Sequence, residues 1–275
     1  MTMSGSITIR DLLSQSTPEV GRFEAFLLLG WVLNRSKTQL ITHELDPVES
    51  HDVERFRAII QARLEGKPIP YITGHQEFFG LDFLVNEHTL IPRPDTETIV
   101  EQVLDRLPQH ARVLELGTGS GCIAITLVHE KPTLEVMATD ISSEALAIAR
   151  TNAQRLKTPV EFREGSWFEP LTVTDGPFDM IVSNPPYIHV EDEHLLNLQF
   201  EPYRALTDEA DGLRCLKAII EGAPAFLKPQ GFLLLEHGYD QGAAVRDLLQ
   251  QRGFQGIETV KDLGNNDRVT LGQFL

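Results

Sequence analysis

Two short stretches of the 275-residue chain carry the side chains best suited to binding a small molecule. In VSNPPYI, an apolar run ends at Asn184, and Pro185 and Pro186 then turn the chain out of the strand, because proline fixes φ and has no backbone donor. Asn184 is therefore expected at the carboxyl edge of a sheet, which is where open α/β sheets bind ligands.

The second stretch, LELGTGSGC, places Gly117, Gly119 and Gly121 between a strand and a helix. Glycines let this backbone approach a ligand closely with its amides facing inward. A dinucleotide-binding fingerprint needs its third glycine where Cys122 stands, so the loop fits the dehydrogenase pattern poorly.

The strand EVMATD ends in Asp140, about 20 residues after the glycines, where a carboxylate can accept both hydroxyls of a ribose. The loop and the carboxylate together indicate a nucleoside ligand. No lysine follows the glycines, which argues against a triphosphate and leaves S-adenosylmethionine as the best candidate.

A sheet is needed to bring these stretches to one edge. From residue 111 onward, strands and helices alternate, which is the pattern of a parallel sheet covered on both faces. The last two strands, ending in RVTLGQF, form a terminal hairpin and bring the count to seven. The fold class is therefore expected to be α/β and Rossmann-like.

The amino-terminal part has a helical pattern instead. The stretch EVGRFEAFLLLGWVLNR predicts a helix, because residues at helical spacing recur along it: Phe23, Phe26, Leu27, Gly30 and Trp31. DPVESHDVERFRAIIQARLEG predicts a second helix, with Gly66 as its carboxyl-terminal cap. Prolines and glycines then punctuate short apolar pieces. We expect a helical domain over residues 1–70, a hairpin linker over 71–95 and the sheet domain over 96–275.

The composition is that of an ordinary globular protein, with 41% apolar side chains. No apolar stretch approaches the roughly 20 residues of a membrane span, and the first residues lack the features of a signal peptide. Cys122 and Cys215 show neither disulfide nor metal spacing, and the histidines show no ligand pattern. We therefore expect a cytoplasmic protein with no membrane association and no metal.

The formal net charge is −16, from 40 acidic and 24 basic side chains. Such a surface repels phosphate backbones, and no run of lysine or arginine interrupts it, so direct binding of nucleic acid is not expected. Solvated acidic faces explain the charge, and a basic protein partner would also fit it.

Several motifs follow one another in the order seen in the HemK-type protein-glutamine methyltransferases, the PrmC family. They are RPDTE, LELGTGSG, SWFEPL, VSNPPYI, EPYRAL, LLLEHG and NNDRVTLG. The chain resembles this family from about residue 67 to its end, and its helical part does so in length and pattern only.

The resemblance implies a seven-stranded S-adenosylmethionine-dependent methyltransferase domain with a small N-terminal helical domain. It also implies methyl transfer to the side-chain amide nitrogen (N5) of the glutamine in the Gly-Gly-Gln motif of peptide-chain release factors. S-adenosylhomocysteine would be the product, and the release factor the protein partner.

The family's motifs also imply roles for individual residues. The cofactor would be held by Glu115, Gly117, Thr118, Gly119, Ser120, Gly121 and Asp140, with Trp167 near the adenine and Asn184 near the reacting methyl. The glutamine would be held by Asn184, Pro185, Pro186 and Tyr187. Two features depart from the family: Glu115 replaces the more usual aspartate, and the loop 188–205 is shorter than usual.

The expected chemistry explains the asparagine. An amide nitrogen is a poor nucleophile because its lone pair is delocalised. The side-chain carbonyl of Asn184 and the backbone carbonyl of Pro185 can each accept one N–H, which aims the lone pair at the methyl carbon and favours charge on nitrogen. Tyr187 can offer a flat face to the planar amide. No strong general base is required.

Three functions stay open from the sequence: glutamine methylation, methylation of an exocyclic amino group in DNA or RNA, and a non-catalytic nucleoside-binding module. The acidic charge disfavours the second, and intact Asn184 and Tyr187 disfavour the third. Trp167 could equally be a core residue. Ion-pair roles are assigned to Arg93, Glu97 and Glu236.

Overall fold

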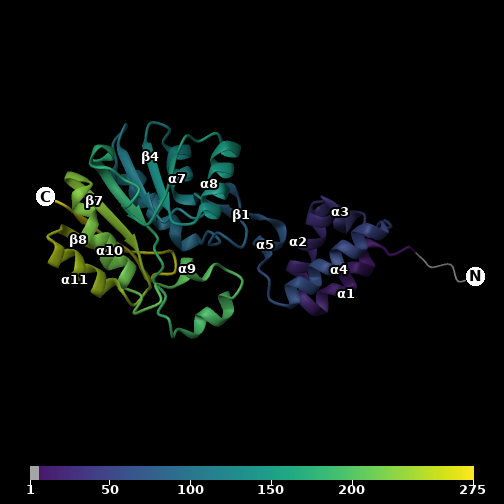
Figure 1. The fold of residues 1–275 in the computed structure, drawn as a ribbon. Helices are drawn as coiled ribbons and strands as arrows, with labels where there is room; N and C mark the ends of the chain where they lie inside the picture. The colour runs from purple at the N-terminus through teal and green to yellow at the C-terminus, as the bar shows by residue number, and fades with distance from the viewer. Residues whose placement is uncertain (1–5) are drawn as a thin grey trace, which may run out of the picture. The chain divides into compact units, whose positions relative to one another are not determined.

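The structure is a computed structural model that describes residues 6–275 (Figure 1). The chain divides into two compact units, one ending at Gly74 and the other beginning at His75. In the described range, no helix combines the length and apolar character of a membrane span.

The first unit consists of helices, as the sequence predicts. They are α1 (Ile9–Val20), α2 (Arg22–Leu33), α3 (Lys37–Thr42), α4 (Ser50–Leu64) and α5 (Ile69–Thr73). Thr8 begins α1 through a capping box with Asp11, and Gly21, at φ +81°, separates α1 from α2. Gly66 has φ +98° just after α4, which confirms its predicted role at the end of that helix.

The buried face of α2 differs from the stripe that the sequence favoured. Ala25, Leu28 and Leu29 are fully buried, whereas Phe23 is 74% exposed. The reason is that α2 carries apolar residues around most of its circumference, so spacing alone cannot select the face that packs. Contacts with α1 and α4 select it instead.

A short hairpin opens the second unit. Strands β1 (His75–Phe78) and β2 (Leu81–Leu84) pair antiparallel through a turn at Phe79 and Gly80, both with positive φ. Phe78 and Phe83 are buried in the same core cluster as the sheet. The hairpin, which the sequence suggested as part of a linker, therefore packs as part of the second unit.

The seven predicted strands form one sheet in the order β5-β4-β3-β6-β7-β9-β8. Pairing is parallel from β5 to β7, and β9 is antiparallel to both β7 and β8, so the expected terminal hairpin is confirmed. The strands are β3 (Arg112–Leu116), β4 (Glu135–Asp140), β5 (Glu161–Glu164), β6 (Phe178–Ser183), β7 (Leu227–Glu236), β8 (Gln255–Lys261) and β9 (Asp267–Gln273).

Helices cover both faces of this sheet (Figure 1). Alternate residues of a strand point to opposite faces, so Val113 joins the core under α6 (Glu97–Arg106), α7 (Cys122–Glu130) and α8 (Ser143–Leu156). Its neighbour Leu114 joins the core under α10 (Arg214–Gly222) and α11 (Gly242–Arg252). The layers are those of a doubly wound α/β domain.

The strand order reverses between β3 and β6. From β3 the chain first extends the sheet through β4 to β5, and it then returns to add β6 on the other side of β3. A doubly wound sheet opens a crevice at the carboxyl ends of the strands on either side of such a reversal. The glycine loop leaves β3 and the Asn-Pro-Pro turn leaves β6 at this point.

Candidate active site

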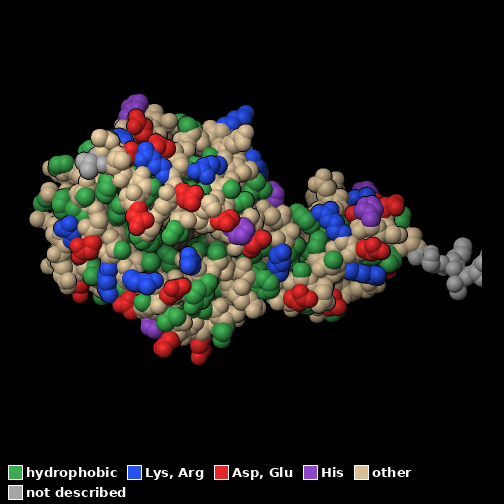
Figure 2. Space-filling view, viewed as in Figure 1, with side chains coloured by type: hydrophobic (Ala, Val, Ile, Leu, Met, Phe, Trp, Pro, Cys, Tyr) green, Lys and Arg blue, Asp and Glu red, His purple; other side chains and the backbone are tan. Residues whose placement is uncertain are grey.

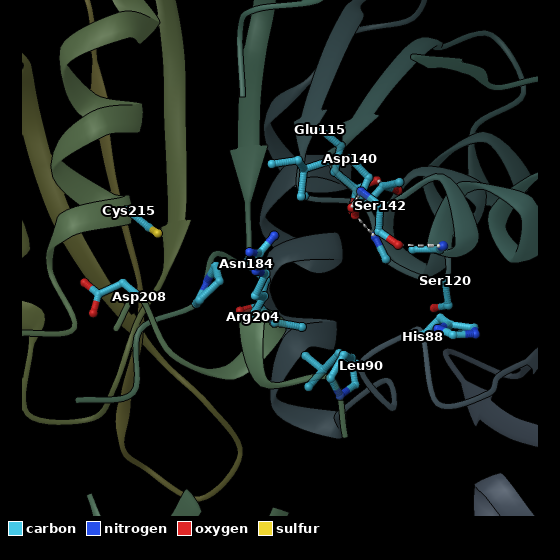
Figure 3. Close-up of a pocket in the computed structure, with 18 of the residues that line it drawn as sticks. His88, Leu90, Glu115, Ser120, Asp140, Ser142, Asn184, Arg204, Asp208 and Cys215 are labelled. Atoms are coloured by element: carbon cyan, nitrogen blue, oxygen red, sulfur yellow. Dashed lines mark hydrogen bonds between the residues drawn. The ribbon is translucent and has the colours of Figure 1, made fainter. Parts of the chain in front are cut away.

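A cavity of about 690 Å³ lies at the carboxyl ends of β3, β4 and β6. Figure 3 shows Glu115 and Asp140 on one side of Asn184, with Asp208 and Cys215 on the other. The predicted site residues in its wall are Glu115, Gly117, Thr118, Gly119, Ser120, Asp140, Trp167, Asn184 and Pro186. The structure thus gathers nine of them from the ends of four strands, β3, β4, β5 and β6.

The cavity opens on the face drawn in Figure 2, where a hollow with hydrophobic side chains is rimmed by acidic and basic ones. Across the described residues of this face, basic side chains are interspersed with acidic ones and are not gathered in one patch.

Backbone hydrogen bonds anchor the glycine loop to the end of β4. The N–H groups of Gly117 and Thr118 both donate to the carbonyl of Thr139 at the end of β4, over 2.9 and 3.0 Å. Gly121 begins α7 at φ +83°, and a Cβ there would lie 2.7 Å from Cδ1 of Ile125. Gly121 is thus required by backbone conformation and by packing, and it does not line the cavity.

Asp140 is tied to the loop across the crevice. Its Oδ2 accepts the N–H of Gly119 over 2.8 Å, and its Oδ1 accepts the N–H of Ser142 over 2.9 Å. Burial raises the pKa of Asp140, and these backbone bonds oppose the shift. Each carboxylate oxygen accepts more than one bond, so both can still receive hydroxyl groups of a ligand.

Glu115 is 1% exposed and lies at the base of the cavity. Its Oε2 accepts the hydroxyl of Thr118 over 2.6 Å and the N–H of Ala124, in the first turn of α7, over 3.1 Å. Burial raises the pKa of Glu115 to about 8, and the charge of Asp140 adds to the shift. A cation placed in the cavity would favour the ionised form of this carboxyl.

Trp167 lies both in the wall of the cavity and against the core, which are the two positions that the sequence left open. It lines the cavity, where a Cβ on Gly117 would lie 3.5 Å from its ring, and it also packs against the second core cluster. Thr139 donates its hydroxyl to the carbonyl of Trp167 over 3.0 Å, which fixes the backbone at the turn after β5.

The Asn-Pro-Pro turn is anchored on both sides. Before it, Ser183 donates its hydroxyl to the carbonyl of Leu116 over 2.7 Å, which joins the ends of β6 and β3. Within it, Nδ2 of Asn184 donates to the hydroxyl of Thr96 over 3.1 Å. The side chain of Asn184 is therefore held by a residue 88 positions earlier in the chain.

Pro185 and Tyr187 are not among the residues that line the cavity, so contact between the Pro185 carbonyl and a substrate amide stays a prediction. The hydroxyl of Tyr187 donates to Oε1 of Glu236 over 3.1 Å, and its carbonyl accepts Nε2 of Gln241 over 3.0 Å. Burial raises the pKa of Glu236 to about 7. Contact between the Tyr187 ring and a substrate amide stays a prediction.

Sequence reasoning missed several residues of the cavity. Ile141 follows Asp140 directly and is 60% exposed on the wall. Thr96 belongs to the RPDTE motif and also lines the cavity, but the sequence predicted no role for it. The remaining unpredicted residues that we single out on the wall are His88, Leu90, Arg204, Asp208 and Cys215.

One ion pair joins two of the quoted motifs. Arg93 pairs with the buried carboxylate of Glu201, which also accepts the N–H of Ile91 over 3.1 Å. RPDTE and EPYRAL therefore meet at the rim of the cavity. The assigned ion-pair role of Arg93 is confirmed, whereas Glu97 accepts the N–H of Phe79.

The sheet topology, the glycine loop and the carboxylate at the end of β4 define an α/β domain of the methyltransferase type. Residues 95–200 match the family model of the methyltransferase small domain, and residues 8–74 match that of the PrmC N-terminal domain. The solved 16S rRNA N2 G1207 methyltransferase of T. thermophilus, in complex with AdoMet and guanosine, shares the fold. Its TM-score is 0.54 at 20% identity, covering 73% of this chain and 50% of that one.

Two curated relatives cover almost the whole chain. A release factor glutamine methyltransferase of Neisseria gonorrhoeae is 48% identical over 92% of this chain and 94% of its own length. One of Xylella fastidiosa strain 9a5c is 46% identical over 95% of this chain and 96% of its own length. The chain belongs to the family of release factor glutamine methyltransferases, as the sequence motifs predicted.

Proposed function

We propose that this protein transfers the methyl group of S-adenosylmethionine to the side-chain amide nitrogen of the glutamine in the Gly-Gly-Gln motif of release factors. The observation that carries the proposal is the position of Asn184, which lines the same cavity as Glu115 and Asp140. A side chain that can accept hydrogen bonds from a substrate amide thus lies beside groups suited to binding an S-adenosyl nucleoside.

The donors and acceptors of the cavity fit this cofactor. Asp140 has lone pairs left for the two ribose hydroxyls after accepting one backbone N–H on each oxygen. The buried Glu115 is suited to the ammonium group of the methionine part, because a cation offsets the cost of ionising a buried carboxyl. Trp167 and Ile141 offer apolar surface for the adenine.

S-adenosylmethionine supplies an electrophilic methyl on a sulfonium sulfur and leaves as S-adenosylhomocysteine. The protein's part is to orient the glutamine amide. Oδ1 of Asn184 accepts one N–H and the backbone carbonyl of Pro185 accepts the other, so that the nitrogen lone pair points at the methyl. Both bonds strengthen as positive charge develops on nitrogen, which stabilises the transition state.

The proton of the methylated nitrogen is acidic and passes to water or to a carboxylate, so no strong base is assigned. Tyr187 contributes by holding the turn, since its hydroxyl is bound to Glu236 and its carbonyl to Gln241. The net charge of −16 favours a protein substrate over a nucleic acid.

The test is to incubate the full-length protein with radiolabelled S-adenosylmethionine and separate pools of purified release factor, DNA and RNA. We expect label on release factor alone, and peptide mass spectrometry should place one methyl group on the Gly-Gly-Gln glutamine. Label on DNA or RNA instead would show that the planar group is a nucleobase amine. A release factor whose motif glutamine is replaced by alanine is the control.

A further inference from the structure

Thr96 lies directly behind the side chain on which the proposed reaction depends. It is 2% exposed, and its hydroxyl accepts a hydrogen bond from Nδ2 of Asn184 over 3.1 Å. A carboxamide carries its nitrogen and its oxygen on opposite sides of one carbon. With the nitrogen held toward Thr96, the Oδ1 atom of Asn184 points to the other side.

A threonine hydroxyl has a single proton to donate. Because the Thr96 oxygen already accepts from Asn184, its own proton must go to a second acceptor. Glu236 is the acceptor that the geometry leaves open: among the described residues, its Oε2 is buried without a hydrogen-bond partner, while its Oε1 accepts the hydroxyl of Tyr187. Thr96 also acts on this carboxyl, because it is one of the groups that lower the pKa of Glu236.

We propose that Thr96 and Glu236 are positioning residues that fix the direction of the Asn184 amide, so that Asn184 presents its carbonyl oxygen and not its NH₂ group to the substrate. Donation runs in one direction, from Asn184 to Thr96 and from Thr96 to the Glu236 carboxylate. The inference rests on the proposed function, because only an N–H-bearing substrate requires an acceptor at this position.

The direction of donation depends on the ionisation of Glu236. A carboxylate can only accept, whereas a protonated carboxyl can donate to Thr96 and release the Thr96 proton toward Asn184. The Asn184 amide would then turn its NH₂ group into the cavity, where it cannot accept the substrate N–H.

The groups that face Glu236 come from several elements. Thr96 and Asp95 belong to the 3-10 turn Pro94–Thr96, Tyr187 follows β6, and Arg268 lies on β9. Burial is the largest cause that raises the pKa of Glu236, and the charge of Asp95 adds to it, while Thr96, Arg268 and Tyr187 lower it, which leaves the pKa at about 7. Arg268 is itself held by Asp262 over 3.0 Å and by Asp95 over 3.2 Å.

The experiment compares Thr96→Val, which removes the hydroxyl at nearly constant volume, with Thr96→Ser, which keeps it. Thr98→Val, at another buried threonine two positions away, is the matched control. For each full-length variant, kcat, KM for release factor and the Kd of S-adenosylmethionine are measured. We expect Thr96→Val to lose roughly 10- to 100-fold in kcat, with the cofactor Kd changed less than about threefold.

Thr96→Ser and Thr98→Val should both remain within about threefold of the parent kcat, since the serine keeps the hydroxyl and Thr98 lies outside the chain of donors. If Thr96→Val is as active as the parent, or if Thr96→Ser is impaired as strongly as Thr96→Val, the hydroxyl does not position Asn184 and the inference is wrong.

Glu236→Gln tests the acceptor. The parent kcat should fall as pH is lowered through about 7, and Glu236→Gln should have a lower kcat without this acid limb. An unchanged acid limb in a folded Glu236→Gln protein would exclude Glu236 as the titrating group.

The parent enzyme is assayed first, so that the two proposals can fail separately. If the parent labels a nucleic acid and leaves the release factor unlabelled, the proposed function is wrong. The ratio of the Thr96→Val and Thr96→Ser rates on the labelled polymer then still decides the positioning role.

Discussion

The backbone N–H of Gly119 donates a hydrogen bond to Oδ2 of Asp140 over 2.8 Å, so that the glycine loop after β3 and the carboxylate after β4 hold each other in place. The N–H of Ser142 occupies the other carboxylate oxygen. Asp140 therefore shapes the loop in addition to its proposed contact with the ribose, and its removal should affect both.

Asp140→Ala is expected to weaken binding of S-adenosylmethionine by roughly 10- to 100-fold, because hydrogen bonds to a charged group are worth about 1.5–3 kcal/mol. A ribose contact is similar in ground and transition states, so KM should rise more than kcat falls. Titration calorimetry measures the affinity. An unchanged Kd in a folded Asp140→Ala protein would remove this carboxylate from the cofactor site.

Asn184→Ala is expected to lower kcat by about 10²-fold or more, while the Kd of the cofactor stays within a few fold. The reason is that its bonds to the substrate amide strengthen only as charge develops on nitrogen. Asn184→Asp keeps an acceptor oxygen and should retain more activity than the alanine variant. Near-parental methylation of release factor by Asn184→Ala would contradict the proposed orientation of the amide.

Gly121→Ala is expected to lower the free energy of unfolding by about 2 to 4 kcal/mol, through positive φ and overpacking together. The new Cβ would lie 2.7 Å from Cδ1 of Ile125 and 3.2 Å from Cβ of Ala149. Gly253→Ala is the matched control, since φ is +100° there and nothing lies within 4 Å, so only about 1 kcal/mol should be lost.

Differential scanning calorimetry of the two glycine variants separates the two effects. Equal shifts of the unfolding temperature would show that the packing of α7 against α8 tolerates a methyl group at position 121.

Cofactor binding is expected to release a proton from Glu115. Because the pKa of this carboxyl is about 8 in the free protein, about nine-tenths of the molecules carry the proton at pH 7, and an ammonium group beside the carboxyl would expel it. Calorimetric titrations at pH 7 in buffers of different ionisation enthalpy count the protons. We expect close to one proton per cofactor in the parent and none in Glu115→Gln; equal release from both would assign the proton to another group.

The raised pKa of Glu115 also makes the free energy of unfolding depend on pH. The folded pKa of this carboxyl is raised above the ordinary value of 4.5, so the folded protein binds more protons than the unfolded chain between pH 4.5 and about 8. Its contribution to stability is full below pH 4.5 and is lost as pH rises through about 8. The free energy of unfolding of Glu115→Gln, compared with the parent, should therefore improve as pH rises across this range.

A protein consisting of residues 75–275 is expected to bind S-adenosylmethionine and to methylate intact release factor poorly. Glutamine is too common for the surroundings of Asn184 to select it alone, so selection requires contacts remote from the reacting group. Residues 75–275 form a compact unit with its own core clusters, which is why cofactor binding should survive. Cofactor affinity and methyl transfer are measured on the same preparation, and parental values of both would rule out a recognition role for the helical unit.

The sequence by itself determined the strand count, the glycine loop and the positions of Asp140 and Asn184. Each of these is a local pattern: a strand followed by a turn and a helix, or a strand ended by two prolines, is specified by residues that are close in the chain. The sheet then brings such strand ends to one edge, so the cofactor side of the site follows from local patterns and a general rule of α/β folds.

Only the tertiary structure decided which face of α2 is buried, that the hairpin with Phe78 and Phe83 packs with the sheet, and that Thr96 holds Asn184. The physical reason is the same in the three cases. An apolar helix, a short aromatic hairpin and a threonine hydroxyl can each satisfy several partners equally well. The partner actually chosen is selected by the packing of the elements around it, and for Asn184 and Thr96 the two partners lie 88 residues apart in the chain.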